Sequence, residues 1–189
     1  PAVKCLHLPD DISYELGSAF VLTYGTSAYA LMQMGKLQPG EWLLVHGASG
    51  GVGLSAVEVG KAMGARVIGT GGNDEKLKVV TEHGAEHVIN YTDGPFKDKV
   101  KEICGSAGAD VIYDPVGGDI FDESLRCINW DGRLLVIGFT SGRIPAAPAN
   151  LALLKNCSIV GVFWGAWTER YPERHRANME IMFQWLREG

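Results

Sequence analysis

The sequence predicts an α/β fold with a doubly wound parallel sheet of six strands. Short apolar runs alternate with amphipathic segments along most of the chain, a pattern typical of strands joined by crossover helices. A glycine-rich turn connects the first apolar run to the first helix of this alternation. With 189 residues, of which 46% are hydrophobic, the chain is long enough for one compact core.

The predicted strands are short apolar runs bounded by glycine or polar residues. They cover Trp42–Val45, Ala65–Thr70, Glu86–Asn90, Asp110–Asp114, Arg133–Phe139 and Ser158–Phe163. Helical spacing predicts a helix from the glycine turn to about Met63, and others over Asp74–His83, Phe96–Cys104, Phe121–Cys127 and Asn150–Lys155. A last helix begins near Pro172, and Met179, Met182, Phe183 and Leu186 share one of its faces.

The residues before Trp42 fit this alternation less well. The apolar run Val3–Leu8 could form a strand that belongs to another sheet. Leu16–Met34 has the pattern of a helix broken near Gly25, and Pro39-Gly40 turns the chain into the first strand.

The turn after Val45 carries the three positions of a dinucleotide fingerprint. Ala48, Gly50 and Gly53 occupy them, with alanine replacing the first glycine. The first position allows a tight turn, the second lets the backbone approach a pyrophosphate, and the third lets the helix pack on the strand. Ser49, Gly51 and Val52 complete the turn. The context of strand, turn, helix and second strand predicts a Rossmann-type site; the alternative is an ordinary glycine-rich turn.

Composition excludes several classes of function. The net charge is −5 and the cations are scattered, so we expect no nucleic-acid partner. No apolar run reaches the ~20 residues that span a bilayer, so we expect no membrane association. The four cysteines are Cys5, Cys104, Cys127 and Cys157. Their wide separation, and the lack of metal-ligand spacing among the histidines, predict no metal site and a soluble, cytoplasmic protein with reduced thiols.

Longer motifs surround the glycine turn. They run over Tyr24–Tyr29, Leu37–Gly53, Val67–Thr70, Val88–Tyr91, Val111–Gly118, Gly132–Gly138 and Gly161–Gly165. In these motifs the chain resembles the zinc-free quinone oxidoreductases of the medium-chain dehydrogenase/reductase superfamily, the zeta-crystallin-like group. The resemblance covers essentially the whole chain.

The resemblance implies a two-domain enzyme that transfers reducing equivalents from NADPH to quinones. Residues 1–14 would then be the trailing edge of an absent substrate domain, and residues 15–189 an NADP-binding Rossmann domain. We expect such a fragment to be inactive by itself, because one wall of the reaction cleft would be missing. No catalytic residue can be assigned: no tyrosine is followed four residues later by lysine, which argues against the short-chain dehydrogenase mechanism.

The choice of NADPH rests on the end of the second strand. The segment Gly69–Asn73, which includes Gly72, has no carboxylate at its tip, whereas an NAD site typically places one there. Asn73 can cap the next helix, with Asp74 and Glu75 in its first turn. The resemblance implies that Lys76, in the same turn, and Tyr91 hold the 2′-phosphate. The alternative for Lys76 is a solvated helix lysine.

The other candidate cofactor-binding residues follow strands or match the family. Val116 follows the fourth strand, and Phe139 and Thr140 follow the fifth, at the carboxyl edge where such sheets bind ligands. Phe163 ends the sixth strand and could wall the nicotinamide pocket or pack at an interface. Thr26 matches a family threonine near the nicotinamide, but its hydroxyl could equally bond to the helix backbone.

Other functions and assemblies stay open at this point. The alternatives to quinone reduction are an NADPH-dependent enal or enone (alkenal) reductase of the same superfamily, a non-enzymatic NADPH-binding module, and a structural, crystallin-like role. In a 3-2-1-4-5-6 strand order Ser158–Phe163 would lie at the sheet edge, so we expect a homodimer through this strand. The competing outcome is a monomer whose edge is covered by Trp164–Tyr171.

Overall fold

A computed structural model describes residues 5–188 of the chain. Its centre is one six-stranded sheet in which every neighbouring pair is parallel, in the order β3-β2-β1-β4-β5-β6. The strands are β1 (Trp42–Val45), β2 (Arg66–Gly71), β3 (His87–Asn90), β4 (Ala109–Asp114), β5 (Ile128–Val136) and β6 (Ser158–Gly161). This order confirms the predicted Rossmann-type fold, whose direction of winding reverses between β1 and β4.

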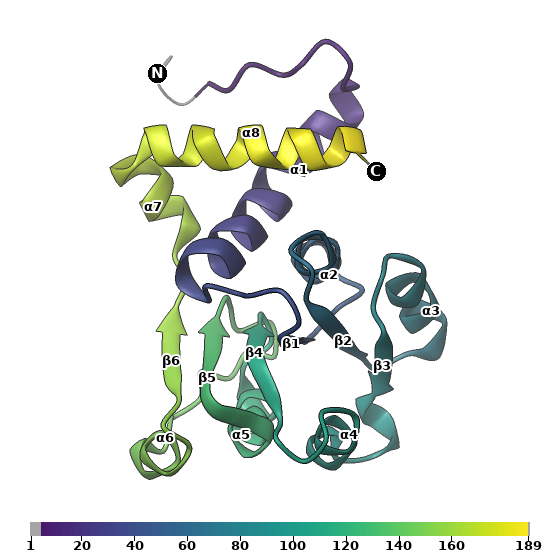
Figure 1. The fold of residues 1–189 in the computed structure, drawn as a ribbon, viewed down its shortest axis with the longest axis vertical. Coiled ribbons are helices and arrows are strands. Elements are labelled where there is room, and N and C mark those ends of the chain that lie inside the picture. Colours follow the sequence, from purple (N-terminus) through teal and green to yellow (C-terminus); the bar gives the residue numbers. More distant parts are fainter. Residues whose placement is uncertain (1–4, 189) are drawn as a thin grey trace.

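Helices cover both faces of the sheet (Figure 1). They are α1 (Tyr14–Ala28), the π-helix η2 (Tyr29–Met34), α2 (Gly51–Ala62), α3 (Asp74–Glu82), the 3₁₀ turn η3 (Tyr91–Asp93), α4 (Phe96–Ile103), α5 (Gly118–Cys127), α6 (Ala149–Lys155), α7 (Trp164–Arg170) and α8 (Pro172–Glu188). Among the described residues, none of these helices is long and apolar enough to cross a membrane.

The two faces of the sheet bury separate hydrophobic clusters because successive strand residues point to opposite sides. In β1, Leu43 and Val45 join the cluster under α1, α2 and α8, whereas Trp42 and Leu44 join the cluster under α4 and α5. A strand buried on both faces has no polar side, which explains why its sequence is continuously apolar.

Two strands differ from their predicted bounds by more than one residue at an end. β5 begins at Ile128, directly after α5, and ends at Val136, whereas the prediction was Arg133–Phe139. The polar residues after Ile128 hide the strand in the sequence, and Asp131, at φ 59°, lies near a register shift against β4. β6 ends at Gly161 and not at Phe163, because α7 begins at Trp164.

The segment before β1 also differs from expectation. α1 continues through Gly25 to Ala28 and passes directly into η2, so the predicted break near Gly25 is wrong. Glycine is needed there for space: a Cβ atom at Gly25 would lie 2.9 Å from Cζ2 of Trp164. Residues 5–8 form no strand, while Val3 and Lys4, the start of the predicted run, lie outside the described residues.

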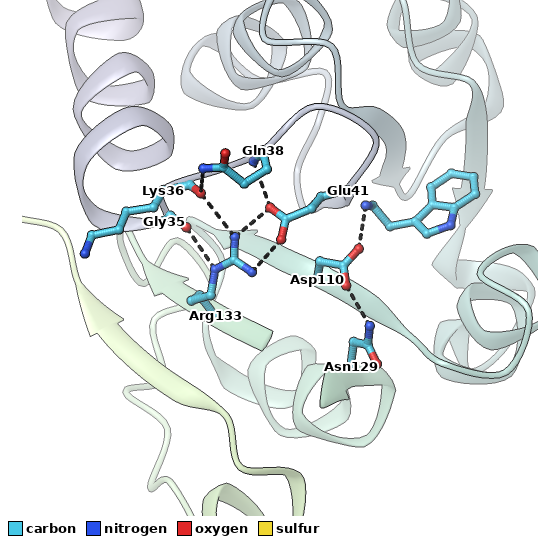
Figure 2. Close-up of polar contacts among 8 residues, drawn as sticks. Gly35, Lys36, Gln38, Glu41, Asp110, Asn129 and Arg133 are labelled. Atoms are coloured by element: carbon cyan, nitrogen blue, oxygen red, sulfur yellow. Dashed lines mark hydrogen bonds and ion pairs between the residues drawn. The ribbon is translucent and has the colours of Figure 1, made fainter. Parts of the chain in front are cut away.

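Polar contacts hold the amino ends of β1, β4 and β5 together (Figure 2). The guanidinium of Arg133 donates to both carboxylate oxygens of Glu41, at 2.9 and 2.7 Å, and to the carbonyl of Gly35 at 2.9 Å. Asp110 accepts from the Trp42 N–H at 2.8 Å and from the Asn129 amide at 2.6 Å. The three strands therefore start at a common, fixed edge.

Glu41 depends on Arg133 for its ionised state. Partial burial acts to raise the pKa of Glu41, but hydrogen bonds from Arg133 and from the Gln38 backbone hold this pKa below the usual value of 4.5. Because the folded-state pKa is depressed, the ion pair stabilises the fold above pH 4.5, and this stabilisation is lost as the pH falls through the folded-state pKa.

We expect Arg133→Met to lower the free energy of unfolding at neutral pH by roughly 1–3 kcal/mol, because Glu41 would stay partly buried without its partner. Urea denaturation of both proteins over a pH series measures this difference, which should shrink below pH 4.5. Arg126→Met is the matched control, since this exposed arginine has no ion pair within residues 5–188. An equal loss for both variants would contradict the prediction.

Candidate dinucleotide-binding site

The glycine turn lies between β1 and α2, where the winding of the sheet reverses. A Cβ atom on Gly53 would lie 2.2 Å from the carbonyl oxygen of Gly47 and 2.9 Å from Cα of Ala48. Only glycine at this position lets α2 approach the turn so closely. The third position of the fingerprint therefore has the packing role that the pattern predicts.

Alanine fits the first fingerprint position because the residue before it, and not this residue, adopts the left-handed backbone conformation. Gly47 has the left-handed conformation, at φ 55°, so Ala48 does not need it. The buried Ala48 donates its N–H to the Thr70 carbonyl at 2.9 Å. Its methyl group faces Gly69 of β2, where an added Cβ would lie 3.1 Å away. The methyl group of Ala48 is thus accommodated because the residue that faces it in β2 is a glycine.

The first turn of α2 offers backbone N–H groups at the carboxyl edge of the sheet. Gly50 is the N-cap residue, and no side chain caps the helix. Gly50 and Gly51 are exposed, and Val52 is half-buried. Because the first N–H groups of a helix have no partner inside it, this turn can accept an anion. Ser49, also half-buried, precedes it.

The end of β2 brings together the residues predicted for the 2′-phosphate. The ring of Tyr91 packs over Gly72, where an added Cβ would lie 3.0 Å from the Tyr91 Cε2 atom. Asn73 caps α3 as predicted, and its Oδ1 atom accepts from the N–H groups of Glu75 and Lys76 at 2.9 and 3.2 Å. Lys76 is exposed, and its ammonium has no ion-pair partner in the described part of the chain.

The loops after β4 and β5 are bonded to each other. Thr140 donates its N–H to the Pro115 carbonyl at 3.1 Å, and Ser141 donates to the Val116 carbonyl at 3.0 Å. Val116 lies near the glycine turn, because a Cβ atom on Gly47 would be 3.5 Å from its Cγ2 atom. Phe139, which is 40% exposed, follows on the same loop. The structure thus brings Val116, Phe139 and Thr140 together beside the fingerprint.

A buried carboxylate, which the sequence analysis missed, organises the loop after β4. Asp114 ends β4, is 1% exposed, and accepts at Oδ1 from the N–H groups of Val116 and Gly117 at 2.8 and 2.9 Å. Burial raises the pKa of Asp114, although these two hydrogen bonds act to lower it. An acidic residue that ends an apolar strand just before a Pro-Val-Gly-Gly turn is the signal that could have identified it.

The other two predicted cofactor-binding residues are Thr26, in α1, and Phe163, just before α7. The Thr26 hydroxyl donates to the Leu22 carbonyl at 2.7 Å, as in the backbone-bonded alternative. α1 does approach the fingerprint, since an added Cβ on Gly51 would lie 3.3 Å from Cγ2 of Thr23. Phe163 is 76% exposed, next to the Trp164 that packs on Gly25. No contact among the described residues joins Phe163 to the glycine turn.

A second residue that the sequence analysis did not identify, His46, supports the glycine turn from the face of the sheet that α4 and α5 cover. It is fully buried, with Nδ1 2.9 Å from the Thr70 hydroxyl and Nε2 2.8 Å from the Ser124 hydroxyl. Burial lowers the pKa of His46 to about 3, so the imidazole is neutral. Because Ser124 donates to the Ile120 carbonyl, Nε2 carries the proton and Nδ1 accepts from Thr70. His46 therefore links β1, β2 and α5.

The part of the chain that the structure describes offers no metal centre. No group of three or more His, Cys, Asp or Glu side chains within it is arranged to hold a metal ion. Cys104 and Cys127 are buried, and Cys157 is half-buried, all as free thiols.

Comparison with known proteins agrees with this geometry. Residues 51–180 match the family model described as zinc-binding dehydrogenase. The chain is 40% identical over 190 residues to a quinone oxidoreductase-like protein 2 homolog of Nematostella vectensis, an alignment that covers 100% of the chain and 52% of that protein. The chain thus spans about half the length of the curated relatives it matches.

Two solved structures have nearly the same backbone. A mycobacterial protein complexed with NADPH matches with a TM-score of 0.93 at 28% identity, over 100% of this chain and 58% of the other. A 2-haloacrylate reductase matches with a TM-score of 0.93 at 29% identity, over 100% of this chain and 60% of the other. The chain therefore belongs to the zinc-binding dehydrogenase family of the medium-chain dehydrogenase/reductase superfamily, in the zeta-crystallin-like quinone oxidoreductase group.

Proposed function

We propose that this oxidoreductase domain binds NADPH and serves a zinc-independent enzyme that reduces quinones. The observation that carries the proposal is the uncapped N-terminus of α2 behind a turn in which Gly53 has no space for a Cβ atom. This is the arrangement that lets a pyrophosphate approach the backbone. The similarity to a quinone oxidoreductase-like protein and to a protein complexed with NADPH supports the choices of substrate and cofactor.

Each part of the cofactor would meet a different element. The pyrophosphate would bind the backbone N–H groups at Gly51–Gly53, and the 2′-phosphate would bind Lys76 beside Tyr91. Val116, Phe139 and Thr140 would hold the nicotinamide, and Thr26 and Phe163 would be further residues of its pocket. When bound, NADPH would supply the reducing equivalents, while these residues bind and orient it.

The proposal assigns residues 15–189 to the NADP-binding domain and residues 1–14 to the edge of a substrate domain in a longer protein. The substrate would then lie between the two domains, and this chain alone would bind NADPH without turnover. The chain's coverage of about half of its relatives supports this division.

A second candidate is the reduction of an activated alkene, such as an enal or enone. The similarity to a 2-haloacrylate reductase, at a TM-score of 0.93, favours it as an alternative. Both reactions would use the same cofactor site. Steady-state assays of the longer protein with NADPH, comparing a quinone with an enone, distinguish the two candidates.

We expect Lys76→Ala to weaken binding of NADPH by ~1–3 kcal/mol and to leave binding of NADH nearly unchanged, because only NADPH offers the 2′-phosphate for a charge-assisted contact. Calorimetric titration of both cofactors measures the difference. Lys78→Ala, which removes an exposed lysine from the same helix, should affect neither cofactor. Equal losses for NADPH and NADH would exclude Lys76 as the phosphate ligand.

We expect Asp114→Ala to weaken NADPH binding about tenfold, because the N–H groups of Val116 and Gly117 would lose their acceptor and the loop carrying Phe139 would shift. Asp114→Asn keeps a carbonyl acceptor, and as a neutral side chain it suits a site where burial raises the pKa of the acid. Its NADPH affinity should therefore stay close to that of the unaltered protein. Calorimetry combined with thermal unfolding tests both variants; equally weakened binding in the two would refute the positioning role.

We also propose that the chain forms a homodimer through β6. Among residues 5–188 this strand pairs only with β5, which leaves this edge of the described sheet open, with Ile159 37% exposed. Open strand edges pair readily, and two-fold pairing would satisfy both copies. Light scattering at micromolar concentration should give the mass of a dimer, and Ile159→Lys should shift it to a monomer. A monomeric unaltered chain would reject this assembly.

A further inference from the structure

A cleft of about 460 Å³ opens between α1, α2, the end of α3 and α8. Its walls are mostly apolar and aromatic, and include Phe20, Val59, Met182, Trp185 and Leu186. α8 lies across α1 on this side of the molecule (Figure 1), and the rings of Phe20 and Phe183 stack at 5.4 Å between them. None of the predicted cofactor-binding residues lines the cleft.

Three hydrogen-bonded side chains from three helices meet in this cleft. The Tyr24 hydroxyl of α1 donates to one oxygen of Glu58 on α2. The Nδ1 atom of His83, at the end of α3, lies 2.6 Å from the other oxygen. Since an ionised carboxylate only accepts, His83 must carry a proton on Nδ1. Burial and the neighbouring Glu58 raise the pKa of Tyr24, so its phenol stays protonated and continues to donate.

The carboxylate of Glu58 is held in place but not saturated. Its two oxygens offer about four acceptor positions, of which Tyr24 and His83 use two. The Glu58 side chain keeps 31% of its surface exposed. A further donor that enters the cleft can therefore bond to a carboxylate whose geometry is already set.

The charge of the lining favours a cation. Besides Glu58, the cleft contains Glu82 and Lys61, so its two carboxylates outnumber its one lysine ammonium. The ring of Tyr24, which stacks on the buried Phe20 at 4.4 Å, and the indole of Trp185 add aromatic groups. Aromatic faces attract ammonium groups, and a cleft of this size is typical of small-molecule sites.

We infer that this cleft binds a small organic ammonium compound whose apolar body packs against Trp185 and Leu186 and whose ammonium group donates to Glu58. The inference does not depend on the proposed function, since it uses other residues. It assigns the cleft to a ligand of this chemical class that binds independently of NADPH.

Calorimetric titration with three probes of similar shape tests the assignment. Phenethylammonium should bind saturably, 2-phenylethanol more weakly, and phenylacetate about tenfold or more weakly than the ammonium, because only the ammonium complements Glu58. Equal affinity for the ammonium and the alcohol would overturn the proposal. So would the absence of saturable binding by any probe, including an absence caused by a second copy covering the cleft.

Glu58→Gln should lower the affinity for phenethylammonium about tenfold while leaving that for 2-phenylethanol unchanged. The glutamine carbonyl keeps an acceptor for Tyr24 or His83, and thermal unfolding checks that the variant folds. If it does not, Glu82→Gln at the cleft should still produce a several-fold loss for the ammonium alone. Glu102→Gln, an exposed residue of α4 on the other side of the sheet, is the matched control. The same effect from Glu102→Gln as from Glu58→Gln would refute the role of Glu58.

A parallel titration with NADPH separates this proposal from the proposed function. We expect Glu58→Gln to bind NADPH as the unaltered chain does. Loss of NADPH binding by Lys76→Ala should leave phenethylammonium binding intact. Either site can therefore fail its test while the other passes.

Discussion

The close approach of α2 to the turn after β1 is the constraint on which the rest of the candidate site depends. With 2.2 Å between a hypothetical Cβ of Gly53 and the Gly47 carbonyl, any larger residue would move the helix away from the sheet. The position of α2 also sets that of α1, because the Ser55 hydroxyl lies 2.9 Å from that of Ser27, which in turn lies 3.1 Å from the Tyr113 hydroxyl of β4. The close approach of α2 to the turn thus orients the N-terminus of α2 and the helix that carries Thr26.

The amino ends and the carboxyl ends of the strands form two edges of the sheet, which are stabilised by different means. The amino edge is closed by charged side chains, with Arg133 bonded to Glu41 and Asp110 bonded to Trp42 and Asn129. The carboxyl edge is held mainly by backbone bonds between loops and by one buried carboxylate, Asp114. This difference leaves the side chains of Phe139 and Thr140 exposed.

Buried polar groups near the site are satisfied in chains that join elements. His46 bonds to Thr70 and Ser124, and so connects β1 and β2 to α5 without a charge. Buried networks of this kind specify one arrangement of the elements, because a displaced member would leave an unpaired polar atom in the core. The glycine turn is therefore supported from both faces of the sheet, by α2 on one face and by His46 on the other.

The sequence by itself determined the element order, the parallel sheet, the fingerprint and the cap at Asn73, because these follow from local periodicity and from residues close in the chain. Tertiary structure alone decided that β5 begins at Ile128, that α1 continues through Gly25, and that the loop after β4 is bonded to the loop after β5. Each of these depends on a partner distant in sequence: the pairing of Ile128 with Ala109, the indole of Trp164, and the loop after β5. Local patterns report which side of an element is buried, but not which residue it is buried against.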